Sequence, residues 1–152
     1  MTVEQILRKR LEPYLKEVVE APENVEAVAM KLFLTDFDIL EYFAEQEKKQ
    51  PTDTAKLRDL VFQRFKTAGI DVSDALDIIT EVDELRIKLA ERDPQFFSII
   101  GLEFVVIDQS LVLLLTASLL TDDPKKLRRI GNKLKELANA LKHYGLLFRL
   151  VL

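Results

Sequence analysis

Residues that break helices are scarce in this sequence. Its 152 residues include four glycines and five prolines, which separate long stretches where apolar side chains recur every three or four positions. That spacing places the apolar side chains on one face of a helix, whereas a half-buried strand needs strict alternation. The only strand-like run that we expect is the closing segment, residues 148–152. The sequence therefore predicts an all-α fold.

The prolines, glycines and capping residues set the expected helix boundaries. Pro13 is expected to kink or restart the first helix, and Asp93-Pro94 and Asp123-Pro124 each combine a cap with a first-turn proline. Short connections favour antiparallel neighbours, and no linker divides the chain. We expect one domain, residues 1–152, folded as an antiparallel bundle of about six helices. The predicted helices cover residues 3–20, 23–49, 52–68 or 53–68, 71–92 or 73–92, 94–120 and 124–145.

Residues 96–120 form the most apolar stretch and carry only Glu103 and Asp108 as charged residues. The stretch is long enough to cross a bilayer, but each carboxylate would cost a few kcal/mol or more near the membrane centre. We therefore predict a central buried helix over residues 94–121. The alternatives are a membrane span and an interface helix that is covered in an assembly.

Two carboxylates fall among apolar positions. Asp108 shares its helix face with apolar neighbours, so it must be paired, hydrogen-bonded or protonated. We expect a structural contact with a basic residue of a neighbouring helix, the alternative being a functional carboxylate. For Asp36 we expect a helix break or a partly exposed edge, rather than a continuous helix that turns the carboxylate to the core.

Four acidic residues recur at helical spacing between residues 71 and 92. They are Asp74, Asp77, Glu81 and Glu84, which share one face opposite the apolar residues of the same helix. This row is a solvated face, a docking surface for a basic partner, or half of a Mg²⁺ site. A Mg²⁺ site would need further acids from a second helix, and the sequence lacks them at the proper spacing.

Positive charge is concentrated at the end of the chain. Residues 124–152 hold eight Lys or Arg and one acid, whereas residues 1–123 hold fourteen Lys or Arg and 25 acids, and the net charge is −4. The apolar row of this last helix should face the core and leave a cationic surface outside, a geometry suited to phosphates. The candidate nucleic-acid contacts are Lys125, Lys126, Arg128, Arg129, Lys133, Lys135 and Lys142. Competing interpretations are a solvated or internally paired face, a protein partner and an anionic membrane.

The segment after the basic helix, residues 145–152, is almost entirely apolar. Such a segment is expected either to pack into the core or to dock on a neighbouring copy or a partner. The candidate protein-interface residues are Leu146, Leu147, Phe148, Leu150, Val151 and Leu152.

Several classes of chemistry are disfavoured by composition. The chain has no cysteine and one histidine, which excludes disulfides and thiolate metal sites and disfavours a serine triad. Its scattered glycines form no phosphate-binding loop. We expect no catalytic residue, no cofactor and no metal. The absence of an export-like N-terminal segment predicts a cytoplasmic location, and the cysteine-free composition resembles that of thermophile proteins.

These features favour a non-catalytic, all-α assembly subunit that acts through protein–protein contacts, with another protein or as a homo-oligomer. The alternative is an accessory subunit of a nucleoprotein complex that grips the DNA or RNA backbone through residues 124–143. A carboxylate metalloenzyme is the third hypothesis.

Overall fold

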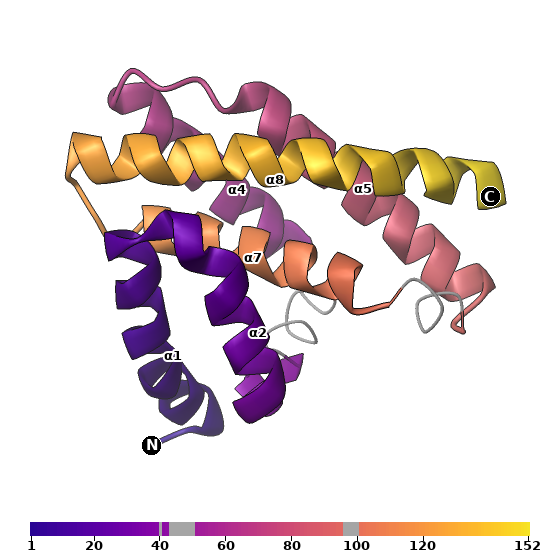
Figure 1. Ribbon diagram of the computed structural model, residues 1–152, viewed down its shortest axis with the longest axis horizontal. Coiled ribbons are helices and arrows are strands. Elements are labelled where there is room, and N and C mark those ends of the chain that lie inside the picture. The colour runs from indigo at the N-terminus through magenta and orange to yellow at the C-terminus, as the bar shows by residue number, and fades with distance from the viewer. Residues whose placement is uncertain (40, 43–50, 96–100) are drawn as a thin grey trace.

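The structure is a computed structural model that describes residues 1–39, 41–42, 51–95 and 101–152 (Figure 1). Within these ranges the regular elements are helices and none is a strand, so the all-α prediction is confirmed. The strand-like run at the end of the chain is helical up to Val151. The elements are α1 (Val3–Glu20), the 3₁₀ helix η1 (Pro22–Asn24), α2 (Val25–Thr35), α4 (Pro51–Thr67), α5 (Ser73–Arg92), α7 (Leu102–Ser118) and α8 (Pro124–Val151).

Local signals account for several helix ends. Asp123 caps α8 by accepting a hydrogen bond from the backbone N–H of Lys125 at 2.9 Å, and Pro124 is the first helical residue, as predicted. Gly69 follows α4 with a φ of 76°, a left-handed conformation that glycine adopts without strain. Pro13 lies inside α1 without ending it.

The stretch predicted as one helix over residues 23–49 is divided. Asp36 lies outside α2, which confirms the expected break, and residues 37–39 and 41–42 are helical again, while residues 43–50 lie outside the described ranges. Two residues of α1 hold the Asp36 carboxylate: Tyr14 donates a hydrogen bond to it at 2.5 Å, and Arg10 forms an ion pair with it. The hydrogen bond from Tyr14 and the pairing with Arg10 lower the pKa of Asp36.

The predicted start of the apolar helix at Pro94 is wrong. Pro94 and Gln95 form a turn in which Asp93 accepts a hydrogen bond from the Gln95 N–H at 3.2 Å. The apolar helix α7 begins at Leu102, directly after Gly101, whose φ is 87°. Residues 96–100, which belong to the same prediction, lie outside the described ranges.

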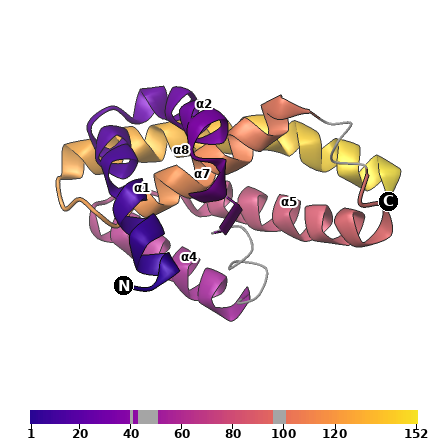
Figure 2. The ribbon, with the colours of Figure 1, turned by 90° about the horizontal axis from the view of Figure 1, so that it is seen from below.

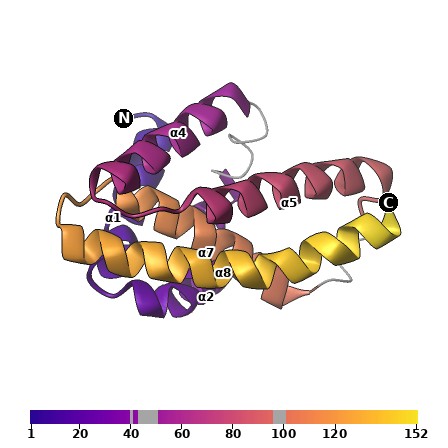
Figure 3. The ribbon, with the colours of Figure 1, turned by 90° about the horizontal axis from the view of Figure 1, so that it is seen from above.

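α7 is the central helix that the apolar stretch predicted. It contacts α1, α2, α4 and α8, and its buried side chains cover more than half of the helix circumference. Figures 2 and 3 show α7 and α8 lying between α2 on one side and α4 and α5 on the other. The buried hydroxyls of Ser110 and Ser118 donate hydrogen bonds to backbone carbonyls of their own helix, each at 2.6 Å, so α7 carries them without an unpaired donor.

Neighbouring helices are not all antiparallel. α7 and α8 are, because Phe104 near the start of α7 contacts Tyr144 and Phe148 near the end of α8, with ring centroids 5.2 and 5.4 Å apart. α5 and α8 run side by side in the same direction (Figure 3): Arg92, at the end of α5, donates a hydrogen bond to the Leu152 carbonyl at 2.8 Å. The antiparallel expectation therefore does not hold for this pair.

α8 does not end near Gly145, where the sequence placed its end. Gly145 is buried inside the helix, and a Cβ atom there would lie 3.0 Å from a methyl group of Val82 on α5. This glycine therefore allows two helices to approach closely and does not stop the helix. Beyond it, the fully buried Phe148 joins the core between Phe104 and Tyr144.

Replacing Phe148 with alanine is expected to lower the free energy of unfolding by about 3–5 kcal/mol, because it removes a buried ring and leaves a cavity. The control is Leu34→Ala on α2, where the side chain is 71% exposed and the expected change is within about 0.5 kcal/mol. Urea unfolding followed by circular dichroism measures both. Equal losses in the two variants would contradict this packing of α8.

Candidate functional site

The inner face of α8 is apolar, as the sequence predicted. Its inward row is fully or almost fully buried and consists of Leu127, Ile130, Leu134, Leu137, Ala138 and Leu141. This row packs against α5 and α7, the two helices with which α8 makes its most extensive contacts. The charged residues of α8 are therefore distributed over its two flanks and its outer face.

One flank of α8 is neutralised by acidic residues from the first part of the chain. We call this set of contacts the ion-pair ladder. The pairs are Lys126 with Glu20 at 2.6 Å, Arg129 with both oxygens of Glu23 at 2.8 and 2.7 Å, and Lys133 with Glu26 at 2.5 Å.

The ladder forms because its acidic residues and its cationic residues recur at nearly the same interval along the chain. Glu20, Glu23 and Glu26 are three residues apart on α1, η1 and α2, and the three cations lie three or four residues apart on α8. The hydrogen bond from Arg129 lowers the pKa of Glu23, and the hydrogen bond to Glu20 raises the pKa of Lys126. For Lys133, burial works to lower the pKa, but its hydrogen bonds to Glu26 and Glu136 outweigh burial and raise the pKa.

The ladder corrects the expectation of one outward cationic strip. Three of the seven candidate nucleic-acid contacts, Lys126, Arg129 and Lys133, are ion-paired within the same molecule. The other four are exposed and form no ion pair within the described parts of the chain: Lys125, Arg128, Lys135 and Lys142. Glu20, Glu23 and Glu26 were not among the residues predicted from the sequence, although their spacing matches that of the three cations.

The candidate interface residues at the end of α8 divide into one buried and five exposed side chains. Phe148 belongs to the core, whereas Leu150 is 86%, Leu146 54%, Leu147 43%, Val151 42% and Leu152 39% exposed. In Figures 2 and 3 this end of α8 lies beside the end of α5, at the opposite end of the molecule from α1. The five exposed side chains are called the C-terminal apolar surface below.

The acidic row of α5 lies on the surface. Asp74, Asp77, Glu81 and Glu84 are all exposed, and Glu81 forms an ion pair with Arg149 of α8. Within the described ranges, no group of three or more His, Cys, Asp or Glu side chains could hold a metal ion. The row is therefore a negatively charged surface next to α8.

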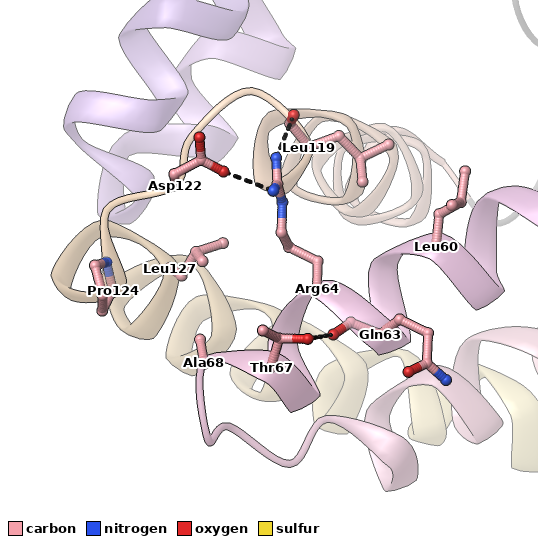
Figure 4. A pocket seen from close by; sticks show the side chains of 9 residues that line it. All are labelled: Leu60, Gln63, Arg64, Thr67, Ala68, Leu119, Asp122, Pro124 and Leu127. Atoms are coloured by element: carbon pink, nitrogen blue, oxygen red, sulfur yellow. Dashed lines mark hydrogen bonds and ion pairs between the residues drawn. The ribbon is translucent and has the colours of Figure 1, made fainter.

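Two arginines of α4 join that helix to its neighbours. Arg64 donates hydrogen bonds to the Leu119 carbonyl just after α7 at 2.9 Å and to Asp122 at 2.6 Å (Figure 4). It also donates to the Ser118 carbonyl at 3.4 Å. Cationic side chains stabilise the unpaired carbonyls at a helix C-terminus. Arg64 crosses a cavity of about 650 Å³ whose lining includes Leu60, Ala68, Leu119 and Leu127. Because all three of its nitrogens already donate, Arg64 connects α4, α7 and the loop that leads to α8.

A second charged cluster lies between α4 and α5. Arg58 forms an ion pair with Asp83 and donates a hydrogen bond to the Thr80 hydroxyl at 2.9 Å, while Arg86 Nε lies 3.9 Å from Asp83. Burial raises the pKa of Asp83, and the positive charges of Arg86 and Arg58 oppose that shift. The cluster fastens α4 to α5 through one partly buried carboxylate.

The two acids of the apolar helix lie in different environments. Glu103 is exposed in the first turn of α7, and Asp108 is half-buried farther along the same helix. Among the described residues, no helix has both the length and the apolar character that crossing a bilayer requires.

Comparison with known proteins finds no matching family model, no matching curated sequence and no matching solved structure. A function for this chain must therefore be inferred from its own residues. Two features of α8 face outward: the C-terminal apolar surface and four cations that form no ion pair with the described residues.

Replacing Glu23 with glutamine is expected to lower the free energy of unfolding at neutral pH, with a loss that shrinks as the pH falls. The pKa of Glu23 is lowered in the folded protein, so the unfolded chain takes up this proton at a higher pH than the folded chain. The stabilisation by Arg129 is therefore present above the ordinary glutamate range and disappears as the pH falls through the lowered pKa.

Urea unfolding at neutral and acid pH measures this difference. Glu17→Gln is the control, because it removes the same charge from an exposed residue of α1 that forms no ion pair within the described chain. A loss in the Glu23 variant that is the same at every pH would count against the ladder.

Proposed function

We propose that this protein is a non-catalytic interaction subunit that binds another protein chain through the C-terminal apolar surface of α8. The observation that carries the proposal is that five of the last seven residues are apolar and at least 39% exposed, although they belong to or directly follow an ordered helix.

The arrangement of these side chains supports a binding role. A single exposed leucine is common on protein surfaces, whereas a contiguous apolar patch marks an interaction site. Leu146 and Leu150 are four residues apart, as are Leu147 and Val151, so each pair lies in a row along the helix. Two adjacent rows at the end of one helix form such a patch.

The electrostatics of α8 also favour a protein partner over a polyanion. The ion-pair ladder neutralises three of its cations, and the whole chain carries a net charge of −4. Both features reduce the attraction that a phosphate backbone would feel.

A photoreactive amino acid at position 150, introduced in cells that produce the protein, is expected to give a covalent adduct with a protein chain on illumination. The control is position 34 on α2, where Leu34 is 71% exposed. Helix α2 lies away from the C-terminal end of α8 (Figure 1). The masses of the adducts on a denaturing gel are the readout. If position 150 gives no protein adduct, or no more than position 34, the proposal fails.

One observation favours a second candidate function, contact with a nucleic-acid backbone. Arg128, Lys135 and Lys142 are seven residues apart, exposed, and free of ion pairs within the described chain. At a rise of 1.5 Å per residue their charges recur about every 10 Å along α8. Such a row would contact phosphates and not read bases, because backbone contacts carry no sequence information.

If this second function holds, the double variant Arg128→Glu and Lys142→Glu should bind DNA and RNA at least about tenfold more weakly for all sequences alike, with a shallower salt dependence. Lys9→Glu with Lys16→Glu makes the same change of charge on α1 and should retain binding. Fluorescence anisotropy over a salt series compares the two. Identical affinities in both double variants would remove this candidate.

A further inference from the structure

The C-terminal apolar surface continues onto α5 through one ion pair. Arg149 of α8 pairs with Glu81 of α5. On α8, Leu146 precedes Arg149 by three residues and Leu150 follows it directly. On α5, Glu84 and Lys88 follow Glu81 by three and seven residues and are both exposed. At 100° per residue, Leu146 and Leu150 lie about 60° and 100° to one side of Arg149, and Lys88 and Glu84 lie about 20° and 60° to the other side of Glu81. An apolar row and a charged row therefore lie on either side of the ion pair.

The two rows lie at the same level along the helices. α5 and α8 run in the same direction, and the close approach of Val82 to Gly145 fixes their relative position. The midpoint of Leu146 and Leu150 is residue 148, three residues beyond Gly145. The midpoint of Glu84 and Lys88 is residue 86, four residues beyond Val82. At about 1.5 Å per residue, the two midpoints differ in level by roughly one residue.

Because the midpoints of the two rows lie at nearly the same level, this face is self-complementary under a two-fold rotation. The two-fold axis lies in the interface, perpendicular to both helices, and passes the midpoints of the two rows. It places Leu146 against Leu150 of a second copy, and Glu84 against Lys88 of that copy. Every contact then occurs twice, as a two-fold interface requires. Apolar side chains contact apolar side chains, and each acid contacts a base.

We propose that this chain forms a two-fold homodimer in which Leu146 and Leu150 of α8, flanked by Glu84 and Lys88 of α5, pack against the same residues of a second copy. This proposal rests on the proposed function and names its partner. Removal of the leucines from water drives the association, and the two ion pairs between Glu84 of one copy and Lys88 of the other set the register.

A second copy fits this face better than an unrelated chain of uniform charge. At the level of Leu146 and Leu150 the charged row presents one acid, Glu84, and one base, Lys88. A wholly acidic or wholly basic partner would therefore place like charges together at one of these positions, which is unfavourable. A contact limited to these two rows is smaller than the roughly 1,200–2,000 Å² of a standard interface. We therefore expect a dimer that dissociates on dilution.

Sedimentation equilibrium over a concentration series tests the dimer. The mass should rise with concentration from 17.5 kDa toward twice that value. Leu150→Glu should keep the monomer mass at every concentration, because it places two carboxylates in the apolar contact. Leu34→Glu on α2 is the matched control and should behave like the unaltered chain. A monomer at all concentrations, or equal dissociation in both variants, would overturn the homodimer.

A charge exchange tests the pairing of the two rows. Glu84→Lys alone and Lys88→Glu alone each bring like charges together across the axis and should weaken dimerisation roughly tenfold. The double variant exchanges the partners and should restore the dimer to near its original strength. Failure of the double variant to recover would overturn this pairing.

The two proposals fail in different ways. A crosslinked adduct at position 150 with a mass of two copies of this chain supports both proposals. An adduct with a different protein, together with a monomeric purified chain, overturns the homodimer and leaves the interaction function in place. The absence of any adduct removes the interaction function itself.

Discussion

The structure depends on the burial of α7. Its side chains are apolar in nearly every direction, so helices on several sides must cover it, and α1, α2, α4 and α8 do so. Each square ångström of apolar surface removed from water contributes about 25 cal/mol, so this cover stabilises the fold. The buried hydroxyls of Ser110 and Ser118 donate to backbone carbonyls within α7, and Arg64 donates to the Leu119 carbonyl at its end.

The position of α7 determines how the charges of α8 are divided. With its leucine row held against α5 and α7, α8 turns one flank toward the end of α1 and the start of α2 and leaves its outer face in solvent. The first flank becomes the ion-pair ladder, while Arg128, Lys135 and Lys142 remain exposed. A concentration of positive charge in the sequence is therefore only in part a positive surface in the fold. This division is why we place the interaction function at the end of the helix.

Within its last two turns, α8 has one side chain buried in the core and several apolar side chains exposed to solvent. Phe148 is buried against Phe104 and Tyr144, and Gly145 lets α8 approach α5, so the last turns stay helical. Because Phe148 and Gly145 fix the face of α8 that contacts the core, Leu146, Leu147 and Leu150 point away from it. An exposed apolar row on a rigid element needs little ordering on binding, which favours association.

Local rules of the sequence determined the helical class, the apolar centre, the inward leucine row, the start of α8 at Asp123-Pro124 and the break at Asp36. They could do so because capping and periodicity act over a few residues. Only the tertiary structure decided that Glu20, Glu23 and Glu26 neutralise one flank of α8, since those acids lie about a hundred positions away from their partners in the chain. It also decided that Gly145 continues a helix: burial of Phe148 outweighs the roughly 1 kcal/mol that glycine costs there, and burial is a property of the assembled core.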